Sequence, residues 1–171
     1  MLNSAARPSA GGPIYTPEQR RRRDASGWTL VQGVLAPLQF LVFLVSAVLV
    51  AGYLLDGRWG FAATVSVFVK TFILYAIMIT GSLWEKDVFG RYLFAPAFYW
   101  EDVVSMLVLA LHTAYLVVAV GGLLPLREQL LLAVAAYVAY VINAGQFLLK
   151  FRQVRLAAVD DGCGAAAGAL R

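Results

Sequence analysis

The chain has 171 residues, of which 61% are hydrophobic and 14% are charged, whereas soluble domains carry about 25% charged residues. This composition excludes a soluble domain of this size. Several uncharged runs exceed the roughly 18 apolar residues that mark a membrane-spanning helix. We therefore expect an integral membrane protein with one compact domain.

The N-terminal region divides into two parts. Residues 1–14 are rich in Gly, Pro, Ser and Ala and predict a disordered extension. Thr16, Pro17 and Gln19 form a capping-box pattern, which predicts a short basic helix on the membrane surface. Its four consecutive arginines, residues 20–23, indicate contact with anionic lipid rather than nucleic acid. The long uncharged run at 25–55 indicates an anchor that stays uncleaved.

Four spans are expected, at residues 30–55, 61–83, 103–124 and 130–149. The connectors at 56–60 and 125–129 are short, so each joins two antiparallel helices. The predicted fold is an all-α integral membrane four-helix bundle made of two helical hairpins, with a short N-terminal interfacial helix. The membrane domain covers residues 15–155, and residues 156–171 form a flexible tail with the single cysteine, Cys163.

Lysines and arginines predict the orientation, because cytoplasmic loops retain them. Eleven lie in the N-terminal region, the middle connector and the C-terminal tail, against two in the short connectors. Both termini and the middle connector are therefore expected to face the cytoplasm.

Two ionisable residues fall inside predicted spans, Lys70 and His112. Such residues are candidates for function because charge is costly in a bilayer. Lys70 could also pair with a carboxylate or reach the interface. His112, the only histidine, could bind a metal held in a macrocycle or move a proton. The alternative is that His112 hydrogen-bonds a neighbouring span.

The middle connector, residues 84–102, holds two carboxylate pairs, Glu85 with Asp87 and Glu101 with Asp102. Burial and a second nearby carboxylate both favour a protonated carboxyl, so a pair can supply a general acid and a general base. The alternative is that all four carboxylates are solvated.

Seven aromatic rings run through the same connector, Tyr92, Phe98 and Trp100 among them. An aromatic belt at the membrane interface would account for them. A connector that lies flat as a lid over an apolar ligand would account for them as well.

Four runs carry a resemblance to a known family. They are YTPEQRRRRDAS (15–26), WTLVQGVLAPLQFLVFL (28–44), WEKDVFGRYLFAPAF (84–98) and WEDVVSMLVLALHTAYL (100–116). Together they resemble the 3-vinyl bacteriochlorophyllide hydratases of photosynthetic bacteria, called 2-vinyl in the older ring numbering. The resemblance covers roughly residues 15–155.

The resemblance implies a lyase of bacteriochlorophyll a synthesis in the photosynthetic inner membrane. It would add water to the C3-vinyl group of chlorophyllide a, or of a related bacteriochlorophyllide, to give a 3-(1-hydroxyethyl) group. It implies no cofactor: water is the co-substrate, and magnesium belongs to the substrate macrocycle.

The residue roles are hypotheses. Either Glu101 or Glu85 acts as the acid, Asp102 as the base, and His112 as a magnesium ligand or proton partner. Lys86 and Arg91 would pair with the substrate propionate. The remaining candidates for substrate binding are Tyr92, Phe98, Trp100 and Lys70.

A second hypothesis is a chlorin-binding carrier or assembly factor that leaves the pigment unchanged. A carrier tolerates conversion of its carboxylates to amides, whereas a hydratase loses turnover. Contacts with membrane lipid are expected, and homodimerisation and contacts with other pigment-pathway enzymes stay open.

Overall fold

The computed structural model describes residues 14–168, without the side chains of 154 and 157–168. The predicted extension, residues 1–14, lies outside the described residues except for Ile14. Within the described part the chain forms five helices: α1 (Pro17–Ala25), α2 (Gly27–Asp56), α3 (Gly60–Phe89), α4 (Tyr99–Gly121) and α5 (Leu126–Gly168).

Helix α1 begins with the predicted capping box. The backbone N–H of Gln19 donates to the Thr16 hydroxyl at 3.2 Å, and the backbone N–H of Thr16 donates to the Gln19 side chain at 2.9 Å. Two of the four N-terminal amide groups that a helix leaves without partners are thereby used. The short basic helix is confirmed.

Helices α2, α3, α4 and the first part of α5 are each long and apolar enough to cross a membrane. Helices α2 and α3 have 30 residues each, or about 45 Å at 1.5 Å per residue. This exceeds the roughly 30 Å hydrocarbon core of a bilayer, so both helices continue past the predicted spans. The predicted all-α membrane bundle is confirmed.

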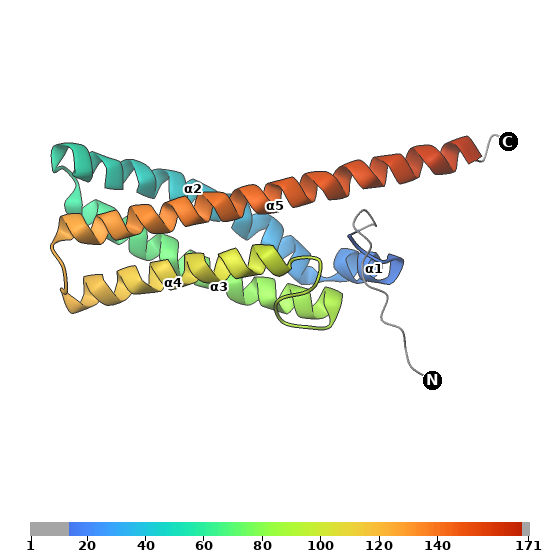
Figure 1. The fold of residues 1–171 in the computed structure, drawn as a ribbon, viewed down its shortest axis with the longest axis horizontal. Helices are drawn as coiled ribbons and strands as arrows, with labels where there is room; N and C mark the ends of the chain where they lie inside the picture. Colours follow the sequence, from blue (N-terminus) through green and yellow to red (C-terminus); the bar gives the residue numbers. More distant parts are fainter. Residues whose placement is uncertain (1–13, 169–171) are drawn as a thin grey trace.

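The bundle consists of two antiparallel hairpins, α2–α3 and α4–α5 (Figure 1). The first turn contains Gly57 at φ 71°, and α4 ends at Gly122 at φ 61°. Glycine adopts these left-handed conformations without the clash that a Cβ atom brings. Two short turns thus set the two hairpins, as the sequence predicts.

Helix α1, the middle connector and the extension of α5 lie at the same end of the bundle, opposite the two short turns (Figure 1). The extension differs from the prediction, since α5 stays helical to Gly168 where a flexible tail is expected. The tail is rich in alanine, which has the highest helix propensity.

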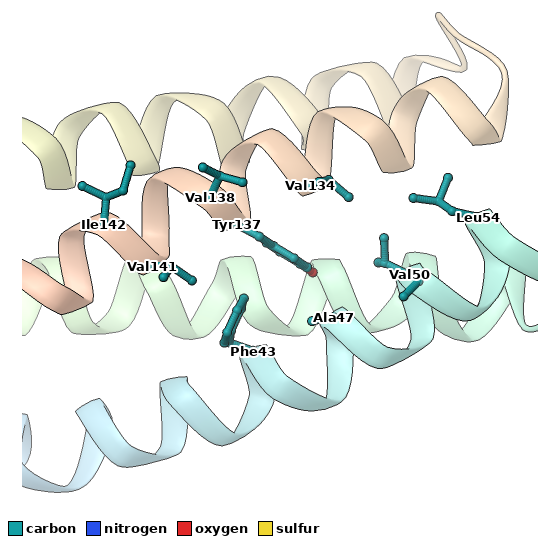
Figure 2. A pocket seen from close by; sticks show the side chains of 10 residues that line it. Phe43, Ala47, Val50, Leu54, Val134, Tyr137, Val138, Val141 and Ile142 are labelled. Carbon is teal, nitrogen blue, oxygen red and sulfur yellow. The ribbon is translucent and has the colours of Figure 1, made fainter.

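The bundle is packed around different cores along its length. Near the short turns, apolar side chains of all four spans pack together, Val50, Val67, Tyr115 and Leu130 among them. Beside this core, an apolar groove of about 440 Å³ lies between α2 and α5, lined by Phe43 and Tyr137 among others (Figure 2). At the connector end the core is largely aromatic and is centred on Phe98.

Candidate functional site

The middle connector brings together two carboxyl groups that are 17 positions apart in the chain. Glu85 lies in the last turns of α3, and Asp102 lies in the first turn of α4. Both are buried, and they lie close enough for each carboxyl group to act on the other. The connector folds over them and donates two backbone amides: Ala95 N–H to Glu85 at 3.2 Å and Phe94 N–H to Asp102 at 2.7 Å.

This carboxyl pair, Glu85 with Asp102, favours the binding of one proton. An ionised carboxylate only accepts hydrogen bonds, so two carboxyl groups bond each other only when one of them is protonated. Two like charges in contact are also unfavourable away from water. The pair therefore combines one acid and one carboxylate, which is the composition that general acid and base catalysis requires.

The backbone conformation of Phe94 directs its N–H group toward the carboxyl pair. Phe94 has φ 58°, a left-handed conformation that is uncommon for a bulky residue and costs roughly 1–3 kcal/mol. In this conformation its N–H points at Asp102. The hydrogen bond to a buried carboxyl helps to offset the strain.

The other two carboxylates have separate partners. Glu101 is buried and forms an ion pair with Lys150 of α5 at 2.9 Å. Asp87 is exposed and accepts a hydrogen bond from Ser26 at 2.8 Å. The structure therefore pairs Glu85 with Asp102 rather than with Asp87. Neighbouring positions on a helix point about 100° apart, so closeness in sequence did not identify the partner.

The connector aromatics divide into buried and exposed rings. Phe98 is 1% exposed and packs among Tyr15, Trp84, Phe89 and Phe147. Phe98 therefore belongs to a structural core in this conformation. Tyr92 and Trp100 are 52% and 69% exposed, so these two candidates are open to a ligand.

Tyr15 closes this aromatic core from the N-terminal side. Its ring stacks on Phe89 at 5.8 Å between centroids, and the Arg23 guanidinium lies 5.0 Å from its centroid. Burial raises the pKa of the Tyr15 phenol to about 12. Tyr15 was not among the candidates from the sequence, although it begins one of the runs that carry the resemblance.

The two candidate anion-binding residues lie on the exposed surface of the connector end. Lys86 donates a hydrogen bond to the Tyr92 hydroxyl, and its Nζ lies 4.3 Å from the Tyr92 ring centroid. Arg91 is exposed next to Tyr92 in the chain. The structure thus brings Lys86 and Tyr92 into contact and leaves both accessible.

Lys70 and His112 are deep in the bundle and form one fully buried unit. His112 Nδ1 lies 2.8 Å from the Val108 carbonyl, which only accepts, so Nδ1 carries the proton. His112 Nε2 then accepts from Lys70 Nζ at 3.0 Å. Both ring nitrogens are occupied, which matches the alternative of a histidine bonded to a neighbouring span.

Aromatic rings complete the surroundings of Lys70. Its Nζ lies 4.1 Å from the Tyr140 ring centroid, 5.2 Å from that of Tyr137 and 5.9 Å from that of Phe43. A cation inside a bilayer gains from such ring faces. His112 is ten positions from Asp102 on α4, about 15 Å along the axis. The candidate residues therefore fall into two groups, and Lys70 and His112 are separate from the carboxyl pair.

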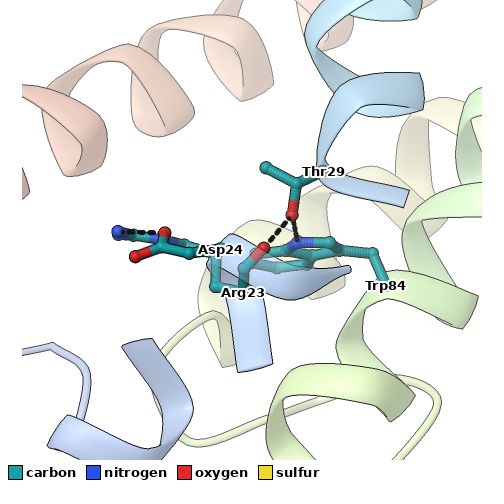
Figure 3. A network of polar contacts seen from close by, with 4 residues as sticks. All are labelled: Arg23, Asp24, Thr29 and Trp84. Carbon is teal, nitrogen blue, oxygen red and sulfur yellow. Dashed lines mark hydrogen bonds and ion pairs between the residues drawn. The ribbon is translucent and has the colours of Figure 1, made fainter. Parts of the chain in front are cut away.

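A polar network joins α1, α2 and α3 at the edge of the aromatic core (Figure 3). Thr29 donates to the Arg23 carbonyl at 2.6 Å and accepts from Trp84 Nε1 at 3.0 Å. Arg23 also pairs with Asp24. The network fixes α1 against the bundle end that carries the carboxyl pair.

Within the described residues, no three His, Cys, Asp or Glu side chains gather in a group that could hold a metal ion. The residues that could contact a metal-containing macrocycle are the exposed rings and cations of the connector, Tyr92, Trp100, Lys86 and Arg91.

Comparison with known proteins identifies the family. The model of the family "2-vinyl bacteriochlorophyllide hydratase (BCHF)" matches residues 15–153. The chain is 57% identical over 164 residues to the protein of that name from Rhodobacter capsulatus, an alignment covering 96% of this chain and 95% of the relative. It is 62% identical over 143 residues to the protein of that name from Cereibacter sphaeroides, covering 84% of this chain and 89% of the relative.

No solved structure matches the chain. The matched range contains α1, the four spans, the connector and every candidate site residue. The chain therefore belongs to the 2-vinyl bacteriochlorophyllide hydratase family.

Proposed function

We propose that this protein is the hydro-lyase that adds water to the C3-vinyl group of chlorophyllide a or a related bacteriochlorophyllide, giving the 3-(1-hydroxyethyl) derivative in bacteriochlorophyll a synthesis. Family membership supports the reaction class. The observation that carries the mechanism is that Glu85 and Asp102 are both buried and accept hydrogen bonds from consecutive connector amides, which places a candidate acid beside a candidate base.

The chemistry requires one proton donor and one proton acceptor. A proton goes to the terminal CH2 of the vinyl group, and the positive charge left on the inner carbon is delocalised into the macrocycle. Water attacks that carbon and loses a proton. We assign proton donation to Glu85 and proton removal from water to Asp102, whose negative charge also stabilises the cation.

Proton exchange between the two groups resets the site. After addition, Glu85 is ionised and Asp102 is protonated, so one proton passes from Asp102 to Glu85 and restores the starting state. Atoms and charges then balance as vinyl plus water gives the alcohol. No redox step occurs, in keeping with a reaction that needs water and no cofactor of the protein's own.

Substrate binding is assigned to the exposed side of the connector. Tyr92 and Trp100 offer ring faces for the macrocycle, while Lys86 and Arg91 offer positive charge for the propionate. Because residues 94 and 95 cover the carboxyl pair, the connector must shift to admit the vinyl group. The magnesium ion belongs to the substrate.

The proposed setting is the photosynthetic inner membrane of a bacterium. Four spans are an even number, so both termini share one side, and the excess of Lys and Arg assigns that side to the cytoplasm. The exposed arginines of α1 suit anionic lipid headgroups. The connector end then faces the cytoplasm.

The experiment that tests the function uses the detergent-purified full chain, chlorophyllide a and H2¹⁸O. The expected product gains one labelled water without any added cofactor, as read by mass spectrometry. In D2O the product should carry one deuterium in its new methyl group. Tight pigment binding with no change of mass would instead support the carrier and overturn the hydratase.

A further inference from the structure

Buried polar atoms without partners extend inward from the carboxyl pair. Within the described part of the chain, both amide atoms of Gln39, Oε2 of Glu101, Oδ1 of Asn143 and Oε1 of Gln146 are buried and make no hydrogen bond. Nearly all buried polar atoms in proteins are bonded to protein or to ordered water. Gln39 stands out because it is 2% exposed and both ends of its amide are free.

Two cross-links place most of these atoms between α4 and α5. Lys150 bonds Glu101 at 2.9 Å, and Asn143 Nδ2 donates to Ser105 at 2.8 Å. Glu101 and Ser105 are one turn apart on α4, and Gln146 lies between Asn143 and Lys150 on α5. The side chains thus line one continuous strip that runs from the connector end into the bundle.

The helix register brings Gln39 to the same strip. Phe43 of α2 packs on Tyr140 of α5 with ring centroids 5.0 Å apart, and the two helices are antiparallel (Figure 1). Gln39 lies one turn before Phe43, and Asn143 lies three positions after Tyr140. Both therefore lie about one turn closer to the connector than this contact.

Aromatic rings lie at the inner end of the polar strip, and Glu101, the neighbour of Asp102 in the chain, lies at its outer end. Inward, Phe43 and Tyr140 contact each other, and Lys70 lies over the Tyr140 ring. Outward, Glu101 is the chain neighbour of Asp102 and acts on it electrostatically, as does Lys150. A polar ligand bound in the strip would therefore lie between the neighbour of Asp102 in the chain and the aromatic rings.

We propose that this polar strip, formed by Gln39, Ser105, Asn143, Gln146 and Glu101, binds the water that the reaction consumes and presents it to Asp102. The size and chemistry of the free atoms suit water, which donates and accepts and typically makes about three hydrogen bonds at a buried site. The inference rests on the proposed hydratase function for the fate of the water, whereas the binding of water does not depend on it.

The first test reads bound water directly. Full-length protein labelled with ¹⁵N-glutamine, in detergent micelles, is measured by rotating-frame NOE spectroscopy at the water frequency, and the Gln39 signal is assigned by its loss in Gln39→Leu. We expect a direct NOE between water and the Gln39 side-chain amide. A Gln39 amide without any water NOE would overturn the proposal.

The second test is kinetic and has a matched control. Gln32 is also on α2, but its side-chain NH2 group has partners, since it donates to Thr80 at 2.7 Å and to the Ile77 carbonyl at 3.3 Å. We expect Gln39→Leu to lower kcat about tenfold or more with KM for the pigment unchanged, and Gln32→Leu to change kcat less than about twofold.

The Tm of Gln39→Leu distinguishes a polar strip that holds water from one that does not. If the strip is dry, Gln39→Leu removes an unpaired buried amide and raises Tm without lowering kcat, which would overturn the proposal. If the strip holds water, Tm stays the same or falls. A preparation that shows the water NOE but never hydrates chlorophyllide keeps the water site and rejects the hydratase function instead.

Discussion

Lys70 of α3 and His112 of α4 bond each other at 3.0 Å inside the bundle, and neither side chain is exposed. This contact joins the two hairpins at a depth where a single unpaired polar group would be costly. A role of Lys70 and His112 in the stability of the bundle fits this contact. That His112 binds the magnesium ion and that Lys70 binds the substrate stay predictions. In this structure both side chains already have hydrogen-bond partners.

The contact between Lys70 and His112 predicts that substitutions at the two positions have non-additive effects on the free energy of unfolding. Lys70→Met or His112→Leu alone leaves one polar partner unsatisfied and should cost about 1–3 kcal/mol, whereas the double variant should lie close to the wild type. Thermal unfolding in detergent measures all four proteins. Additive losses would contradict a direct bond. Pigment affinity should be unchanged in His112→Leu, and a large loss would restore its role as a magnesium ligand.

The carboxyl pair predicts which amide substitutions stop turnover. Glu85→Gln and Asp102→Asn should each lower kcat at least about 100-fold because one removes the acid and the other the base. Glu101→Gln should cost less, since its partner is Lys150. Initial rates of chlorophyllide hydration measure the effect, with Asp87→Asn as the exposed control. Normal rates in folded Glu85→Gln and Asp102→Asn would refute the assignment.

The backbone amide of Phe94 can be tested without touching a carboxyl group. Phe94→Pro removes the N–H that bonds Asp102 and cannot adopt φ 58°, so kcat should fall about tenfold or more. Phe94→Gly keeps the N–H and accepts that φ, so it should retain most of the activity. Equal losses in both variants would show that the ring matters rather than the amide.

Tyr15 predicts a change in stability at high pH. Its phenol pKa is raised to about 12 in the folded protein and is about 10 when unfolded. The folded state therefore favours the neutral phenol, and this stabilisation is complete below pH 10 and is lost as the pH rises from 10 towards 12. The difference in Tm between wild type and Tyr15→Phe, measured from pH 8 to 11.5, should change in that window. A constant difference would contradict a buried phenol.

The helices and hairpins could be predicted from the sequence because long uncharged runs and short polar connectors are local signals. The capping box of α1 at Thr16 and Gln19 is likewise a pattern four residues long. The helical extension to Gly168 was not predicted, since glycines interrupt its alanines and indicate a flexible tail.

The site could be predicted only in part. Composition drew attention to the connector and to its carboxylates, but their partners depend on how α3 and α4 meet. Lys150 and Tyr15 come from the far ends of the domain, and nothing near them in the chain marks them as neighbours of Glu101 or Phe98. Contacts over such distances along the chain arise from tertiary packing, which hydrophobic periodicity does not encode.

The same long-range contacts bear on how the protein is made. Glu101 enters the membrane with α4, but its counter-charge, Lys150, lies near the end of the apolar span of α5 and is synthesised almost 50 residues later. A buried carboxylate without a partner is costly in a bilayer. The second hairpin is therefore expected to insert as a unit, and a chain released before α5 is complete lacks the positive charge that Glu101 requires. Helix α5 thereby completes the surroundings of Glu101.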